Sequence, residues 1–298
     1  MQLDRRINGT TILTGLIGNP VGHSVSPVLH NSLYTVLGIN GAYVPLPVPG
    51  GSLGEAVKGL KACGFAGFNI TIPYKEEILE YIDEADEEVK LLGTSNTVCI
   101  RNGRLYAYNT DADGFVRDFK EQAGTGFERK NVCILGAGGT ARALSAKIIL
   151  DGAAEVNIIN RTGSKAETLA GVLNRLLKER GCAAKRVSAA ASYTTEALKL
   201  LSRCDVIVNT TSAGMHPVTD ASPLPQDFTF KSSQFIYDVI YNPSRTKLIS
   251  TAKEYGCQTA NGAGMLFYQG IRAFEIFTGT TVPDETAKWL LADFLKYL

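Results

Sequence analysis

The sequence predicts an α/β protein, and two patterns in it support this fold class. Glycine and proline separate short apolar runs that alternate with longer stretches of helical period. In the later part of the chain these runs form repeated strand–helix–strand units, which indicate a parallel sheet with helices on both faces. With 298 residues, 45% of them hydrophobic and 20% charged, the chain is long enough for two domains.

Charge and hydropathy narrow the expected partners and compartment. The 30 lysines and arginines almost balance the 29 aspartates and glutamates, and a net charge of +1 argues against nucleic acid as a partner. No apolar run approaches the roughly 20 residues that span a bilayer. Polar residues follow the basic pair Arg5 and Arg6, so no signal peptide is expected. We expect a soluble, cytoplasmic protein without a membrane partner, either a monomer or a homodimer.

The six cysteines are scattered along the chain, with no CxxC pair and no clustering with the three histidines. This distribution predicts buried, reduced thiols rather than disulfides or a zinc site, and we expect no metal. The cysteines are Cys63, Cys99, Cys133, Cys182, Cys204 and Cys257.

The first part of the chain predicts alternating strands and helices. Near Pro27 a helix begins in which apolar residues recur with the spacing of one buried face. Asn102-Gly103 predicts a hairpin, because both turn positions favour positive φ. The expected strands span residues 11–17, 42–48, 67–72, 97–100 and 104–108, and the other expected helices span residues 52–63 and 75–92.

From about Asp113 onward, strand–helix–strand units dominate. A helix holding Phe115 and Phe119 is expected first. The last stretch, from Gly264 to Leu298, predicts one or two helices that either close the second domain or return to the first. The expected strands here span residues 131–135, 155–159, 205–208 and 235–239.

The segment VCILGAGGTARAL carries a dinucleotide-binding pattern. Gly136, Gly138 and Gly139 follow a strand and precede a helix. Glycines there allow a tight turn and let a pyrophosphate approach the backbone amides. Ala141 replaces the third glycine of the pattern, so a merely tight strand-to-helix turn remains an alternative.

The residues at the end of the next strand help to distinguish an NAD site from an NADP site. NAD-binding sites usually carry an acidic residue there, for the ribose 2′-hydroxyl. This chain has Asn160-Arg161-Thr162 followed by Lys165, and the two cationic side chains attract a 2′-phosphate. NADP is therefore favoured over NAD, the alternative being that Arg161 and Lys165 are solvated surface charges.

Two serines flank Val25 where the helix near Pro27 begins. Ser26 fits an N-cap with Pro27 at the first helical position. Ser24 and Ser26 together also form a neutral cradle for an anion, such as a ligand carboxylate. His23 is expected to be a structural loop residue, because no second His or Cys pattern accompanies it.

Lys75 and Asp111 are candidates for proton chemistry. Lys75 stands in the first turn of an expected helix, facing the positive end of the helix dipole, and follows the strand that carries Thr71. A lysine there could exchange a proton with a carbonyl or alcohol; the alternative is an exposed lysine paired with a nearby glutamate. Asp111 is either a helix cap or a carboxylate that binds a substrate hydroxyl and stabilises an ammonium.

Nine short motifs occur in order along nearly the whole chain. They are GNPVGHSVSPVLHN (18–31), NITIPYK (69–75), SNT (95–97), NTD (109–111), GAGG (136–139), NRT with Lys165, NTTSAGM (209–215), YDVIYNP (237–243) and NGAGMLFYQG (261–270). Together they closely resemble the shikimate dehydrogenase family.

The resemblance implies an N-terminal α/β substrate domain completed by the C-terminal helices, residues 1–111 and 262–298. It also implies an inserted Rossmann-like NADP-binding domain, residues 112–261. The implied reaction is the NADPH-dependent, reversible reduction of 3-dehydroshikimate to shikimate, in the pathway to chorismate and the aromatic amino acids.

The resemblance also implies the site residues. Lys75 and Asp111 would form the catalytic pair, and Ser24 and Ser26 would hold the substrate carboxylate. Further substrate hydrogen bonds would come from Thr71, Asn96, Tyr241 and Gln269. The cofactor would contact Gly136, Ala137, Gly138, Gly139, Thr140, Asn160, Arg161, Thr162 and Lys165, with Val239 and Gly262 at its nicotinamide end.

Two other functions remain open. A quinate or dual quinate/shikimate dehydrogenase often uses NAD; the basic segment argues against NAD, and Ser rather than Thr at position 26 favours shikimate. A non-catalytic dinucleotide-sensing module would keep GAGG but would not need Lys75 together with Asp111.

Overall fold

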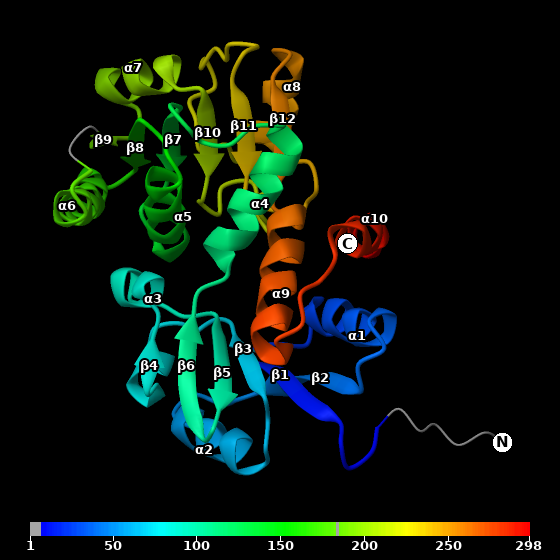
Figure 1. The fold of residues 1–298 in the computed structure, drawn as a ribbon. Helices are drawn as coiled ribbons and strands as arrows, with labels where there is room; N and C mark the ends of the chain where they lie inside the picture. Colours follow the sequence, from blue (N-terminus) through cyan, green and yellow to red (C-terminus); the bar gives the residue numbers. More distant parts are fainter. Residues whose placement is uncertain (1–6, 183–184) are drawn as a thin grey trace. The chain divides into compact units, whose positions relative to one another are not determined.

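The computed structural model confirms the α/β fold class and describes residues 7–182 and 185–298 (Figure 1). Residues 1–6, where no signal peptide is expected, lie outside the described residues. The chain forms two compact units. The first contains the described residues up to Asp113 and those from Phe267 onward, and the second contains those from Gly114 to Leu266. Each unit is built on one six-stranded sheet.

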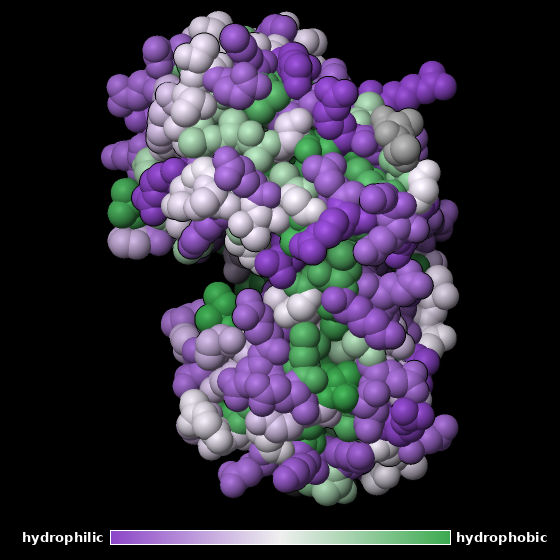
Figure 2. Space-filling view, turned by 90° about the vertical axis from the view of Figure 1, so that its left-hand side faces the viewer, coloured by the Kyte–Doolittle hydropathy of each residue, from purple (hydrophilic) through white to green (hydrophobic). Residues whose placement is uncertain are grey.

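Among the residues that the structure describes, no helix has both the length and the apolar character needed to cross a bilayer. The face drawn in Figure 2 is mostly hydrophilic, with smaller hydrophobic patches between the hydrophilic side chains.

The sheet of the first unit combines parallel and antiparallel strands. Its strands are β1 (Ile12–Gly18), β2 (Gly41–Pro47), β3 (Gly67–Ile70), β4 (Glu84–Ala85), β5 (Thr97–Arg101) and β6 (Arg104–Tyr108), in the order β2-β1-β3-β5-β6-β4. β1 pairs in parallel with β2 and β3, whereas β5 runs antiparallel to β3 and β6. The hairpin predicted at Asn102-Gly103 is confirmed, and both residues have positive φ.

Helix α2 shows how the first unit closes over its sheet. The helices with residues in this unit are α1 (Ser26–Val36), α2 (Leu53–Ala62), α3 (Glu87–Leu92), α4 (Asp111–Ala123), α9 (Ala263–Thr278) and α10 (Asp284–Tyr297). Leu53 and Val57 lie four apart on α2, so they share one face and pack against Phe68 and Ile70 of β3. Full burial of one such side chain contributes about 1.5–3 kcal/mol to stability.

The helix expected over residues 75–92 is wrong. The chain instead forms a short 3₁₀ helix (Glu77–Tyr81), then β4, then α3. Asp83 accepts a hydrogen bond from the Leu105 backbone, and β4 pairs with β6, so this acidic stretch joins the sheet. Asp86 then caps a new helix by accepting from the Val89 N–H at 2.7 Å.

The second unit has an entirely parallel sheet, as predicted. Its strands are β7 (Asn131–Leu135), β8 (Glu155–Asn160), β9 (Arg186–Ala191), β10 (Val206–Asn209), β11 (Phe235–Asp238) and β12 (Gln258–Asn261). The order β12-β11-β10-β7-β8-β9 is that of a Rossmann sheet, with the switch point between β7 and β10. β9 and β12 were not expected from the sequence.

Helices lie on both faces of this second sheet. The remaining helices are α5 (Gly139–Leu150), α6 (Gly163–Glu179), α7 (Thr195–Arg203) and α8 (Lys247–Glu254). From β7 the chain passes through α5 to β8 and through α6 to β9. Helix α7 then leads back to β10 on the other side of β7, and α8 connects β11 to β12. Because parallel crossovers are right-handed, these two pairs occupy opposite faces. Leu200 of α7 and Leu248 of α8 share one buried cluster with Ile207 and Ile236 of the sheet.

The cysteines are free thiols, and most are buried as expected. Cys99, Cys133, Cys204 and Cys257 are buried, and Cys182 is partly exposed. Cys63 is exposed, contrary to expectation, because it is the C-cap residue of α2. Among residues 7–182 and 185–298, no group of three or more His, Cys, Asp or Glu side chains is placed to hold a metal ion.

Candidate active site

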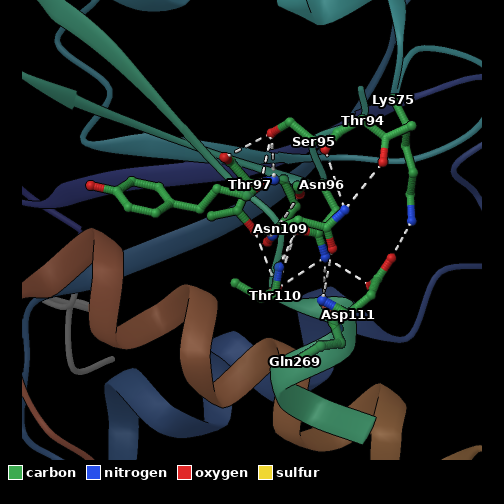
Figure 3. Close-up of polar contacts among 11 residues, drawn as sticks. Lys75, Thr94, Ser95, Asn96, Thr97, Asn109, Thr110, Asp111 and Gln269 are labelled. Atoms are coloured by element: carbon green, nitrogen blue, oxygen red, sulfur yellow. Dashed lines mark hydrogen bonds and ion pairs between the residues drawn. The ribbon is translucent and has the colours of Figure 1, made fainter. Parts of the chain in front are cut away.

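Lys75 and Asp111 form an ion pair in the first unit. Lys75 Nζ donates to Asp111 Oδ2 at 2.6 Å, and the two side chains are 34% and 20% exposed (Figure 3). Asp111 is the first residue of α4, and its N–H donates to Asn109 Oδ1 at 3.2 Å. The structure therefore brings the predicted pair together, with both side chains partly exposed.

The helix dipole does not act on Lys75 as the sequence suggested. Lys75 lies in a turn, and the only helix that follows directly is the 3₁₀ helix beginning at Glu77. The partner of its ammonium is Asp111, 36 positions along the chain, rather than an adjacent glutamate. A tertiary contact thus sets the position of the Lys75 ammonium.

Asn96 holds the other oxygen of the Asp111 carboxylate. Its Nδ2 donates to Asp111 Oδ1 at 2.8 Å and to Thr110 Oγ1 at 2.9 Å, while its Oδ1 accepts from the Thr110 N–H at 2.8 Å. Gln269 of α9 lies at 3.4 Å from the same Nδ2. Asn96 is only 3% exposed, so its buried amide holds the Asp111 carboxylate in one orientation.

Two residues that the sequence did not assign extend this network. Tyr43 donates its hydroxyl proton to Asn69 Oδ1 at 2.8 Å, and Asn69 Nδ2 donates to Thr97 Oγ1 at 2.9 Å. Burial raises the pKa of the Tyr43 phenol well above its ordinary value, so the hydroxyl keeps the proton it donates. The alternation of Asn69 with Thr71, which directly follows β3, was a signal for this polar face, whereas Tyr43 gave none.

Ser26 lies beside the Tyr43 phenol and lowers its pKa, against the larger effect of burial, which raises it. The N-cap role considered for Ser26 is wrong, because Ser26 is the first residue of α1 and the N-cap is Val25. Ser24 Oγ instead accepts from the Ser26 N–H at 3.2 Å, and Pro27 occupies the first turn as expected. The two hydroxyls thus lie at the start of α1.

A cavity of about 920 Å³ lies in the second unit, at the carboxyl ends of β7, β8 and β10. This edge of a Rossmann sheet is where dinucleotides bind. Six predicted cofactor residues line it: Gly136, Ala137, Gly138, Asn160, Arg161 and Lys165. The sequence did not assign the lining residues Ser192, Tyr193, Thr210, Thr211, Ser212 and Ala213, although four of them belong to the NTTSAGM motif.

The glycine turn has the geometry that a phosphate site needs. Gly136 has a φ of +116°, and a Cβ there would lie 2.6 Å from Thr210 Oγ1, so a side chain is excluded. Gly138 is the N-cap of α5, and Gly139 and Thr140 are its first residues. The first N–H groups of a helix have no intrahelical partner and carry partial positive charge, which suits a pyrophosphate.

The cationic residues of the cavity suit a 2′-phosphate. Arg161 and Lys165 both line the cavity beside the end of β8. Asn160 Nδ2 donates to the Thr162 carbonyl at 2.9 Å, which fixes the turn that carries Arg161, and Thr162 is the N-cap of α6. The donor set therefore fits NADP.

Three other predicted residues also belong to the second unit. The Val239 N–H donates to the Asn209 carbonyl at 3.0 Å, and a Cβ at Gly262 would collide with the Val239 carbonyl, so Val239 and Gly262 are in contact. Neither lines the cavity. Tyr241 is 38% exposed.

Comparison with known proteins identifies the family. The shikimate dehydrogenase substrate binding domain matches residues 16–98, the shikimate / quinate 5-dehydrogenase family matches residues 119–241, and the shikimate 5'-dehydrogenase C-terminal domain matches residues 262–288. A shikimate dehydrogenase (NADP(+)) of Carboxydothermus hydrogenoformans is 42% identical over 290 residues, which cover 95% of this chain and 97% of the relative.

Solved structures agree with this comparison. Shikimate 5-dehydrogenase from Listeria monocytogenes, in complex with shikimate and NAD, has a TM-score of 0.89 at 34% identity, covering 97% of this chain and 99% of that one. A shikimate dehydrogenase in complex with NADP+ has a TM-score of 0.85 at 38% identity, covering 97% of each chain.

A second activity also occurs among the structural neighbours. Quinate dehydrogenase from Corynebacterium glutamicum, in complex with NAD, has a TM-score of 0.84 at 28% identity, covering 96% of this chain and 99% of that one. The identity and coverage of the curated relative nevertheless confirm the predicted resemblance and the oxidoreductase class. The chain belongs to the shikimate dehydrogenase family.

Proposed function

We propose that this protein is an NADP-dependent shikimate dehydrogenase that reversibly reduces 3-dehydroshikimate to shikimate. The observation that carries the proposal is the 2.6 Å ion pair between Lys75 and Asp111, held in place by the buried amide of Asn96. Membership of the family supports the reaction class, and the name of the curated relative supports NADP.

Lys75 would move the proton. Bound NADPH would supply the hydride that reaches the carbonyl carbon. As the carbonyl oxygen gains negative charge, it takes a proton from Lys75 Nζ; the N–H bond breaks, the O–H bond forms, and the amine is left neutral. Oxidation of shikimate runs the same transfer in reverse. Asp111 holds Nζ in position and accepts a hydrogen bond from a substrate hydroxyl.

The other predicted substrate-binding residues would orient the substrate. We assign Ser24 and Ser26 to its carboxylate, because two hydroxyls at the start of α1 bind an anion without adding a cation. Further hydrogen bonds would come from Thr71, Asn96, Tyr241 and Gln269. We retain residues 1–111 and 262–298 as the substrate domain and residues 112–261 as the cofactor domain.

The cavity of the second unit would hold the cofactor. Residues 136–140 would bind the pyrophosphate at the N-terminus of α5, and Arg161 and Lys165 would bind the 2′-phosphate. Asn160 and Thr162 would shape the turn that carries Arg161. Val239 and Gly262 would contact the nicotinamide end of the cofactor.

A quinate or dual quinate/shikimate dehydrogenase is the second candidate, favoured by the structural likeness to the NAD-bound quinate dehydrogenase. Initial rates with shikimate and with quinate, each with NADP+ and with NAD+, decide between the two. We expect shikimate with NADP+ to give the highest kcat/KM. Preference for quinate with NAD+ would replace the proposal with the second candidate, and oxidation of neither substrate by folded protein would reject both.

A further inference from the structure

Asp238 is a buried carboxylate at the carboxyl end of β11. It is 0% exposed, and its hydrogen bonds come from neutral donors of its own unit. Oδ1 accepts from Asn209 Nδ2 at 2.9 Å and from the Ile240 N–H at 3.1 Å, and Oδ2 accepts from Thr246 Oγ1 at 2.7 Å. One side chain therefore joins β11 to the end of β10 and to the N-cap of α8.

The bond to Asn209 fixes which way that buried amide faces. With Nδ2 on the Asp238 carboxylate, Asn209 Oδ1 faces Thr211, where it accepts from the N–H at 3.0 Å and from Oγ1 at 2.7 Å. A flipped amide would place its oxygen against the carboxylate, so Asp238 excludes that orientation. Thr211 and the neighbouring residues 210, 212 and 213 line the cavity.

The bond to Ile240 fixes a second segment. It holds the turn that directly follows β11 and begins with Val239. The Val239 N–H also donates to the backbone carbonyl of Asn209 at 3.0 Å, so this turn lies against the end of β10, where the 210–213 segment begins. By contrast, Arg161 and Lys165 follow β8, which β10 and β7 separate from β11 in the sheet.

We propose that Asp238 is a positioning residue for the nicotinamide half of the NADP site. It acts through Asn209 on the 210–213 loop and through Ile240 on the turn at Val239, without touching the cofactor. This inference rests on the proposed function. The adenosine half, which we assign to Arg161 and Lys165, is independent of Asp238.

Two ligands separate these halves in a titration by calorimetry. NADP+ occupies both halves, whereas adenosine 2′,5′-bisphosphate lacks the nicotinamide half. Asp238→Ala should raise the Kd of NADP+ about tenfold, the effect of losing about one hydrogen bond, and change the Kd of the bisphosphate less than twofold. Asp238→Asn should restore binding to within about threefold, because its oxygen still accepts from Asn209 and its amide donates to Thr246.

Asp118→Ala is the matched control, because it truncates another buried aspartate of the same unit. It should leave both dissociation constants unchanged. Asn209→Ala cuts the same link from its other end and should reproduce the pattern if Asp238→Ala does not fold. Equal weakening of both ligands, or of neither, overturns the role of Asp238. Failure of the wild-type protein to bind either ligand overturns the proposed function itself.

Discussion

Asn96 Nδ2 lies 2.8 Å from Asp111 Oδ1, and Lys75 Nζ donates to Oδ2, the other oxygen of that carboxylate. The hairpin creates this relationship: Asn96 directly precedes β5, Asp111 follows β6, and the Asn96 N–H donates to the Tyr108 carbonyl at 3.2 Å. Residues 15 positions apart in sequence are thereby brought into contact. The turn at Asn102-Gly103 therefore sets the geometry of the proposed catalytic pair.

Asn96→Ala should destabilise the protein by about 2–4 kcal/mol. It leaves the Thr110 N–H and the Thr97 hydroxyl without the amide oxygen that accepts them, and an unsatisfied buried donor costs about 1–3 kcal/mol. Urea unfolding monitored by circular dichroism measures the change. Gln258→Ala, at an exposed position of β12, should change the free energy of unfolding by less than about 0.5 kcal/mol. Equal effects of the two substitutions would show that Asn96 makes no special contribution.

Arg161→Ala should weaken NADP+ binding about tenfold to a hundredfold and leave NAD+ binding within about twofold. Charge-assisted hydrogen bonds to a phosphate contribute about 1.5–3 kcal/mol, and only NADP+ carries the 2′-phosphate. Fluorescence or calorimetric titration with both dinucleotides measures the difference. Arg175→Ala on the exposed side of α6 is the control and should change neither affinity. A parallel loss of affinity for both dinucleotides would remove Arg161 from 2′-phosphate recognition.

His30 should make the protein sensitive to acid. Its ring is 0% exposed, stacks on Tyr43 with centroids 4.1 Å apart, and has no hydrogen-bond partner for either nitrogen within the described chain. Burial lowers the pKa of His30 from 6.5 to about 3. Below pH 6.5 the unfolded chain gains a proton that the folded protein does not, so stability falls as the pH drops toward 3.

His30→Leu removes this titration. Between pH 7 and pH 4.5 the wild-type protein should lose about 3 kcal/mol of unfolding free energy relative to the variant, from about two pKa units of unequal protonation. His23→Gln, at an exposed loop histidine, should track the wild type. If the difference in unfolding free energy between the wild-type protein and His30→Leu does not change with pH, burial does not lower the pKa of His30.

Asp118 should act in the opposite direction. Burial raises the pKa of this carboxyl from 3.8 to about 6, although the Tyr237 hydroxyl donates to Oδ2 at 2.6 Å. As the pH rises from 4 to 6 the unfolded carboxyl ionises before the folded one, so the folded state loses up to about 3 kcal/mol, and the loss is complete above pH 6.

Asp118→Asn keeps an acceptor for Tyr237 and does not titrate. Relative to this variant, the wild-type protein should become less stable between pH 4 and pH 7, as measured by chemical unfolding in a pH series. If the wild-type protein gains stability over that interval relative to Asp118→Asn, the folded carboxyl is not protonated near neutrality.

Local signals with a clear mechanism predicted much of the fold. The strand–turn–helix at Gly136 and the hairpin at Asn102-Gly103 each depend on residues that are adjacent in sequence and on positive φ. β9 was missed because RVSAAA is rich in alanine and has no apolar alternation, and β12 was missed because QTAN is short and polar. Both strands exist because a neighbouring strand pairs with them, which a local pattern does not report.

The candidate site likewise contains some residues that local sequence signals identify and others that they do not. Lys75, Asp111 and Arg161 stand at ends of predicted elements, where side chains meet ligands, and the sequence singled them out for that reason. Tyr43 and Asp238 lie within the strands predicted over residues 42–48 and 235–239, and the local pattern gives neither residue a functional role. Their roles come from contacts with residues far along the chain, Asn69 and Asn209, and no periodicity encodes such pairs.

The central claim is that Lys75 transfers the proton, and the kcat of Lys75→Ala tests it most directly. Measured with saturating shikimate and NADP+, kcat should fall at least about a hundredfold, the low end for loss of a general acid or base, while KM changes little. Lys58→Ala, at an exposed position of α2, should keep wild-type turnover. Near-normal kcat in folded Lys75→Ala would contradict the account.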